Sequence, residues 1–83
     1  MMDYDELTKK IIEIIAENLE KTDEIDDITA DMDILEDLKA DSLNVVEIVM
    51  AIQDEFEIEV PDADIPGLKT IRDIVDYVEN RLA

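Results

Sequence analysis

Apolar side chains recur every three or four residues along three stretches of the sequence, the spacing that puts them on one face of an α-helix. The first stretch predicts a helix that begins at residues 3–5 and ends at about residues 19–20. Acidic residues fill its first turn, where the positive end of the helix dipole stabilises them. The predicted inner face of this helix consists of Tyr4, Leu7, Ile11, Ile14 and Ile15.

The second helix is predicted to begin at residues 41–42 and to end at about residues 55–56. Asp41 suits the N-cap position, and Ala40 and Val45 have the spacing of a hydrophobic staple. The core-facing stripe of this helix consists of Val45, Ile48, Val49, Ile52 and Phe56. A second row lies on roughly the opposite side and consists of Leu43, Glu47, Met50 and Asp54, with Val46 between the two faces.

The third helix is predicted to begin after Thr70, an N-cap residue that Asp73 follows three positions later. A short helical turn at about residues 62–65 precedes it, and Pro66-Gly67 predicts the end of that turn. The inner face of the third helix consists of Ile71, Ile74, Val75, Val78 and Leu82.

Residues 21–40 lack a clear period, and we predict an ordered loop with a short turn at residues 34–38. Aliphatic side chains pin this loop to the core: Ile25, Ile28, Met32, Ile34, Leu35 and Leu38. A flexible linker is the alternative, which so many aliphatic residues disfavour. The predicted fold is all-α, a small four-helix bundle of three longer helices and one short helix in a single domain over residues 1–83, with the long ordered loop after the first helix.

Composition narrows the function. Seven Lys and Arg against 25 Asp and Glu give the 83 residues a net charge of −18, which disfavours binding to nucleic acid or an anionic membrane and favours basic partners. The absence of Cys and His excludes disulfides, thiolate zinc sites and a Ser-His-Asp triad. The sequence has neither a membrane-spanning apolar run nor a secretory signal pattern, so we expect a cytoplasmic protein. We also expect it to be a monomer.

Two features of the second helix are candidates for function. Leu43 and Met50 on its outer row are either ordinary exposed apolar residues or anchors that dock basic partners. Ser42, the sole serine, lies where free backbone N–H groups favour an anion such as a phosphodiester, although serine is also a routine helix-start residue. No general base accompanies Ser42, so we do not expect it to act as a catalytic nucleophile.

Two further classes of function were weighed. Asp31 and Asp33 are spaced like the first two ligands of a calcium-binding loop, but the third ligand, the glycine and the closing glutamate of such a loop are missing. We therefore assign no metal site, although clustered carboxylates can attract divalent cations loosely. A protein that mimics nucleic acid would also be acidic, but its charged surface would lack an exposed apolar row such as that of Leu43 and Met50. This class of function is therefore disfavoured.

The segment around Ser42 carries a resemblance to a known family. It reads Leu38-Lys39-Ala40-Asp41-Ser42-Leu43, then Val46-Glu47-Ile48-Val49-Met50-Ala51-Ile52 and Glu55-Phe56. The pattern continues through Glu59-Val60-Pro61-Asp62 and Thr70-Ile71 to Tyr77. Over nearly its whole length the chain resembles an acyl carrier protein, and most closely the discrete carrier of type II fatty-acid synthesis.

This resemblance implies a non-catalytic four-helix carrier. Ser42 would bear a phosphopantetheine arm that a carrier-protein synthase, a phosphopantetheinyl transferase, takes from coenzyme A, and the arm's thiol would hold an acyl chain as a thioester. Other partners would be enzymes of fatty-acid synthesis with basic docking patches. The implied partner-recognition residues are Asp41, Leu43, Val46, Glu47, Met50 and Asp54. The implied residues near the acyl cavity are Val46, Ile52, Val60, Ile65, Leu68 and Ile74.

Two residues depart from the family pattern. Lys39 stands where the family usually has glycine, which suggests that no left-handed backbone is required there. Asn44 stands where fatty-acid carriers usually have aspartate, which removes a charge near the synthase contact. The alternative function is therefore a carrier for a specialised pathway, with a polyketide, aminoacyl or D-alanyl cargo.

Overall fold

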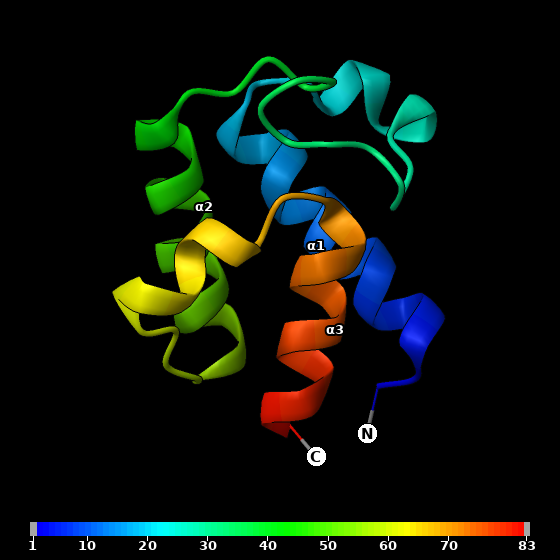
Figure 1. The fold of residues 1–83 in the computed structure, drawn as a ribbon. Coiled ribbons are helices and arrows are strands. Elements are labelled where there is room, and N and C mark those ends of the chain that lie inside the picture. Colours follow the sequence, from blue (N-terminus) through cyan, green and yellow to red (C-terminus); the bar gives the residue numbers. More distant parts are fainter. Residues whose placement is uncertain (1, 83) are drawn as a thin grey trace.

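The computed structural model describes residues 2–82, which form five helices and no extended strand (Figure 1). The three longer helices are α1 (Tyr4–Asn18), α2 (Ser42–Phe56) and α3 (Ile71–Leu82). Two short 3₁₀ helices, η1 (Thr22–Asp27) and η2 (Asp62–Gly67), lie in the connections. The predicted all-α bundle with three longer helices is confirmed, and η1 is an additional short helix that the sequence did not predict.

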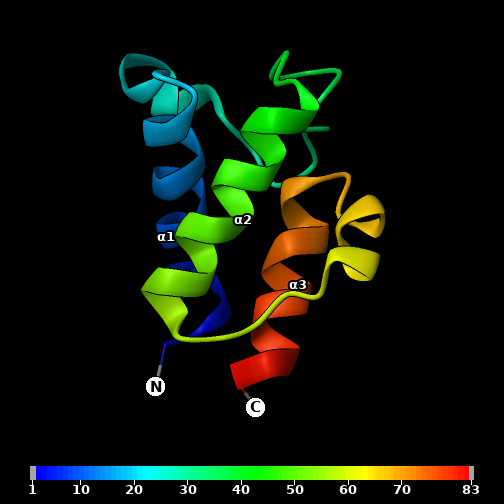
Figure 2. The same ribbon diagram turned by 90° about the vertical axis from the view of Figure 1, so that its left-hand side faces the viewer.

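The three α-helices enclose an apolar core. The α1 helix packs against both α2 and α3, and η2 lies beside α3 on the side away from α1 (Figure 2). Burial of each large aliphatic side chain contributes about 1.5–3 kcal/mol to stability. The largest fully buried side chains are Ile11 and Ile15 of α1, Ile48 and Ile52 of α2, Ile71, Val75 and Val78 of α3, and Ile34 of the long connection.

Side chains cap the starts of α1 and α3, and the cap at Thr70 was predicted. Asp3 caps α1 by accepting a hydrogen bond from the Glu6 backbone N–H at 2.8 Å. In α3 the Thr70 hydroxyl accepts from the Asp73 N–H, while the Asp73 carboxylate accepts from the Thr70 N–H, both at 3.1 Å. Such reciprocal capping satisfies backbone donors that have no partner within the helix.

The long connection between α1 and α2 is ordered, as predicted, and it is tied to the start of α3. Ile34 donates its backbone N–H to the Lys69 carbonyl at 3.0 Å, and Ile71 donates to the Met32 carbonyl at 3.2 Å. Ile28, Ile34 and Leu38 are buried. The flexible-linker alternative is therefore wrong, because most aliphatic side chains of this segment form part of the core or pack against it. Leu35 is the exception: it was predicted to pin the loop to the core but is 51% exposed.

Four local expectations need correction. Leu82, predicted on the inner face of α3, is 45% exposed because it lies in the last turn at the end of the bundle. Tyr4 of α1 is 37% exposed and donates its hydroxyl to Asp76 at 2.8 Å instead of packing in the core. Pro66 and Gly67 belong to η2, whose second turn is closed by a bond from the Leu68 N–H to the Ile65 carbonyl at 3.0 Å.

The fourth correction concerns Lys39. Its φ is +60°, so the backbone is left-handed there, and the inference that no left-handed backbone is required at this position is wrong. The neighbouring side chains explain the strain, because Leu38 and Ala40 on either side are both buried. The turn between these two anchored residues forces Lys39 into a conformation that favours glycine.

Candidate functional site

Ser42 occupies the first turn of α2, where its side chain is exposed. The preceding residue supplies the cap: the Asp41 carboxylate accepts from the Asn44 N–H at 2.9 Å, and the Asn44 side-chain oxygen accepts from the Asp41 N–H at 3.1 Å. The helix start is therefore held without the Ser42 hydroxyl. That hydroxyl stays available at the positive end of the helix dipole, a favourable place for a phosphate group.

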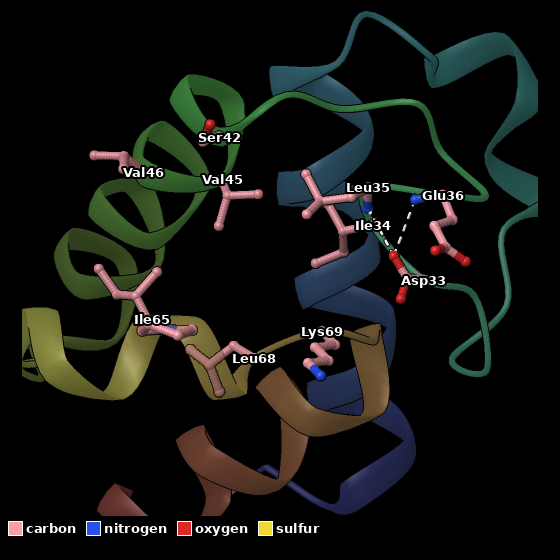
Figure 3. A pocket seen from close by; sticks show the side chains of 11 residues that line it. Asp33, Ile34, Leu35, Glu36, Ser42, Val45, Val46, Ile65, Leu68 and Lys69 are labelled. Atoms are coloured by element: carbon pink, nitrogen blue, oxygen red, sulfur yellow. Dashed lines mark hydrogen bonds between the residues drawn. The ribbon is translucent and has the colours of Figure 1, made fainter.

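An apolar pocket of about 550 Å³ opens beside Ser42 (Figure 3). Val45 and Val46 line it from α2, Ile65 lines it from η2, and Leu68 follows directly after η2. Ile34 and Leu35 of the long connection close it on another side. The charged side chains at the pocket, those of Asp33, Glu36 and Lys69, lie at the end away from α2 (Figure 3).

The structure separates the six residues expected near an acyl cavity into two sets. Val46, Ile65 and Leu68 line the pocket beside Ser42. Ile52 and Ile74 are each 2% exposed and belong to the main core. Val60 is also buried, and its backbone N–H donates to the Gln53 side chain at 2.7 Å near the far end of α2, away from Ser42.

Several residues of the pocket were missed by the sequence reasoning. Val45 was assigned to the core stripe of α2, yet it is only half-buried and faces the pocket. Ile34 and Leu35 lie in a segment without periodicity, so the sequence carried no signal for the direction of their side chains. Pro66 was interpreted as part of a helix stop and Lys69 was given no role, but both line the pocket.

The outer row of α2 presents apolar side chains to solvent. Leu43 is 67% exposed, Met50 58% and Val46 41%. Glu47 and Asp54 on the same helix are exposed as well, as is Asp41 at its start. Five residues of the expected partner face therefore share one exposed side of α2, and Asp41 is exposed at the N-cap of the same helix: the five are Leu43, Val46, Glu47, Met50 and Asp54.

The η2 wall of the pocket is joined to α3 by a cluster of polar side chains. The Tyr77 hydroxyl donates to the Asp64 carboxylate at 2.7 Å, and Arg81 donates to the Tyr77 hydroxyl at 2.7 Å. Arg81 also lies 3.5 Å from the Asp64 carboxylate. Partial burial and the nearby Asp64 carboxylate raise the pKa of Tyr77, so this hydroxyl stays a donor at neutral pH.

Metal and membrane sites were also sought. Among residues 2–82, no three acidic side chains are grouped closely enough to hold a metal ion. Every helix within the same range is too short or too polar to cross a lipid bilayer.

Comparison with known proteins identifies the family. A family model described as a phosphopantetheine attachment site matches residues 9–78. The acyl carrier proteins of Rickettsia canadensis (strain McKiel) and Rickettsia prowazekii (strain Madrid E) are each 43% identical to the chain over 81 residues, which is 98% of this chain and 92% of theirs. The chain belongs to the acyl carrier protein family. The structure of an acyl carrier protein from Enterococcus faecalis agrees, with a TM-score of 0.77, 34% identity and coverage of 96% of this chain and 99% of that one.

The family resemblance seen in the sequence is therefore confirmed. Acyl carrier proteins are non-catalytic carriers that bear covalently attached phosphopantetheine and work with acyl chains and enzyme partners. The residues around the start of α2 fit such a group, because an exposed hydroxyl, a helix N-terminus and an apolar pocket adjoin one another.

Proposed function

We propose that this acyl carrier protein bears its phosphopantetheine on Ser42 and shuttles acyl thioesters between enzymes of fatty-acid synthesis. The observation that carries the proposal is the position of the sole serine, exposed at the N-terminus of α2 and on the rim of an apolar pocket. Phosphopantetheine would supply the thiol that this cysteine-free chain lacks. Ser42 would hold the phosphate by a phosphodiester bond, and the helix dipole would stabilise its negative charge.

In this proposal the acyl chain lies in the pocket beside Ser42. Val45, Val46 and Leu68 supply apolar contacts close to the attachment point. Burying the chain there removes apolar surface from water, at about 0.8 kcal/mol for each methylene group. Ile52, Val60 and Ile74 would support the surrounding core without touching the chain.

The proposed docking surface for enzymes is the exposed side of α2. Leu43, Val46 and Met50 would act as apolar anchors, and the surrounding carboxylates of Asp41, Glu47 and Asp54 would attract basic patches on the partners. The partners we expect are a carrier-protein synthase and the enzymes of fatty-acid synthesis. The negative charge of the whole chain would also accelerate encounters with them at low salt. The cytoplasmic location, the monomeric state and the single domain over residues 1–83 of this protein stay predictions. Residues 1 and 83 lie outside the described range.

The attachment site is tested by incubating variants with a carrier-protein synthase and coenzyme A and measuring intact mass. We expect wild type to gain one phosphopantetheine and Ser42→Ala to gain none. Thr29→Ala is the matched control, since Thr29 is the exposed hydroxyl of another loop, and it should be modified like wild type. Because Asp41 caps α2 without the serine hydroxyl, Ser42→Ala should lose about 1 kcal/mol of stability or less.

Modification that persists in Ser42→Ala would contradict the assignment of Ser42. A wild-type chain that several synthases leave unmodified, under conditions in which they load another carrier, would contradict the carrier function as proposed.

A carrier role in a specialised pathway is the second candidate. Lys39 and Asn44 both reduce the negative charge next to Ser42, where fatty-acid carriers usually have glycine and aspartate. Mass spectrometry of the thioester on protein isolated from the native host distinguishes the two. A saturated or 3-hydroxyacyl chain supports fatty-acid synthesis, whereas a polyketide, aminoacyl or D-alanyl unit supports the alternative.

A further inference from the structure

The η2 helix forms one wall of the pocket, yet the fold holds it weakly. It has no side-chain N-cap and contributes no fully buried residue, whereas α2 and α3 on either side each bury at least three side chains. Ile65 and Pro66 nevertheless line the pocket from this helix. Segments with few buried apolar contacts are the ones that open most readily.

The other walls of the pocket are less able to move. Ile48 and Ile52 anchor α2 in the core. The segment from Asp33 to Glu36 is held by the bond from the Ile34 N–H to the Lys69 carbonyl and by its own turn, in which the Asp33 carboxylate accepts two backbone N–H groups at 2.9 Å. A chain longer than the pocket can therefore be enclosed fully only if η2 moves.

Three side chains oppose that displacement. Asp64 of η2 accepts a hydrogen bond from Tyr77 and lies 3.5 Å from Arg81, both of which belong to α3. The Arg81 guanidinium also lies 4.9 Å from the centre of the Tyr77 ring. Each member thus contacts the other two, and hydrogen bonds to a carboxylate are stronger and more directional than those between neutral groups.

We propose that Asp64, Tyr77 and Arg81 form a latch that limits the movement of η2 and thereby sets the length of acyl chain that the pocket shields. The inference rests on the proposed function, since it requires acyl cargo in this pocket. Because the Asp64 and Arg81 side chains are partly exposed, the bonds to Asp64 contribute only about as much as the burial of one methylene group. Chains longer than the closed pocket by more than about that amount would break the latch in wild type.

The test measures melting temperature as a function of acyl-chain length. Each variant is loaded by a synthase from coenzyme A or from saturated acyl-coenzyme A of increasing length, and the melting temperature of each acyl form is compared with that of the same variant carrying the free arm. Tyr77→Phe and Asp64→Ala open the latch. Tyr4→Phe is the matched control, because Tyr4 donates to Asp76 at 2.8 Å in a second tyrosine–aspartate pair that does not involve η2.

In wild type and Tyr4→Phe, the acyl-induced rise in melting temperature should increase with chain length and then level off. In Tyr77→Phe and Asp64→Ala it should level off at chains about one methylene group longer. The double variant should match Asp64→Ala, because that change alone frees η2 from both Tyr77 and Arg81, whereas Tyr77→Phe leaves the Arg81–Asp64 pair in place. A general loss of stability cancels in this comparison, since each acyl form is referred to its own variant.

A plateau at the same chain length in wild type, Tyr77→Phe and Asp64→Ala would contradict the latch but leave the proposed carrier function standing. An equal shift in Tyr4→Phe would overturn it as well, because the effect would then follow from the loss of any tyrosine hydroxyl that donates to an aspartate, including one on α1 that does not contact η2. A wild-type chain that takes no arm would instead overturn the proposed function, and the latch with it.

Discussion

At the scale of single residues, the backbone is left-handed at Glu20, Lys39 and Glu57, with φ of 56°, 60° and 55°. A residue with a side chain costs about 1–2 kcal/mol in this region compared with the right-handed one. Glu57 ends α2 in a cap that usually contains glycine or asparagine, with its N–H bonded to the Gln53 carbonyl. Lys39 lies three residues before Ser42, so one of the three strained positions adjoins the candidate attachment site.

Replacing Lys39 by glycine should therefore stabilise the fold. Glycine removes the steric cost of the left-handed backbone but adds freedom to the unfolded chain, so we expect a net gain of about 0.5–1 kcal/mol. Urea denaturation measures this gain. Lys39→Ala is the matched control, because it removes the same charge while its Cβ keeps the backbone strain. Its free energy of unfolding should not rise. Equal stability of the two variants would show that the change in charge alone is responsible.

At the scale of elements, α2 serves two surfaces at once. Its inner side buries Ile48, Val49 and Ile52, while its outer side leaves Leu43 and Met50 more than half exposed. Exposed apolar residues contribute little to the stability of the isolated chain, since they stay in water after folding. Their presence among carboxylates is typical of a surface that another protein covers.

Changes on this outer side should weaken partner binding without unfolding α2. We expect Met50→Ala and Glu47→Lys each to lower the affinity of a carrier-protein synthase by roughly ten-fold, because one removes an apolar anchor and the other reverses an attractive charge. Circular dichroism should show helix content near wild type. The effect of Glu47→Lys, measured by titration calorimetry, should shrink as salt rises.

Glu13→Lys is the control for net charge, because Glu13 is an exposed residue of α1 that lies outside the α2 surface. It should weaken synthase binding much less than Glu47→Lys. Loss of helicity in both Met50→Ala and Glu47→Lys would mean that this side of α2 supports the core, contrary to its exposure.

The N-terminal cap of α3 makes stability depend on pH. Hydrogen bonds from the Thr70 and Lys69 backbone N–H groups lower the pKa of Asp73 below its usual value. A pKa that is lower in the folded chain means that the ionised carboxylate stabilises the fold above the unfolded-chain value of about 3.9, and that this contribution is lost as pH falls through the folded value.

Asp73→Ala should therefore cost about 1 kcal/mol at pH 7, and the difference from wild type should vanish in acid below the folded pKa. Paired urea denaturation curves across the pH range measure this difference. Glu79→Ala, which changes an exposed carboxylate on the same helix, should show little difference from wild type at any pH. An Asp73→Ala cost that stays constant into acid would contradict a role for the ionised cap.

At the scale of the whole molecule, the net charge of −18 opposes compaction. Residues 2–82 contain four ion pairs: Lys10 with Glu55, Lys21 with Glu24, Arg72 with Asp31, and Arg81 with Asp64. Such surface pairs contribute little each, and they leave most carboxylates uncompensated. The apolar core and the helix caps therefore stabilise the folded chain against the repulsion between its carboxylates.

Added cations should consequently raise the melting temperature. Sodium chloride screens the repulsion over distances beyond about 10 Å at 0.1 M, and Mg²⁺ or Ca²⁺ should act at millimolar concentration because a divalent ion can neutralise neighbouring carboxylates. Differential scanning calorimetry at matched ionic strength separates the two effects. A melting temperature that stays flat across both titrations would contradict the importance of charge repulsion.

Much of the fold could be predicted because the relevant signals are local. The predicted caps at Asp41 and Thr70 depend on residues three positions apart, so they can be recognised in the sequence. The α2 helix, which carries Ser42, was placed to within a residue for the same reason. Leu82 was assigned to the core wrongly, since periodicity gives the face of a helix but not where its neighbours stop.

The sequence by itself determined the helices, their caps, the family and the available chemistry, because these depend on residue types at short spacings. Only the tertiary structure decided the pocket, which Ile34, Val45 and Ile65 form from segments far apart along the chain. The left-handed backbone at Lys39 likewise follows from the burial of its two neighbours, a constraint that acts through space. Both features depend on packing between elements that are distant along the chain, and such packing cannot be predicted from short-range sequence patterns.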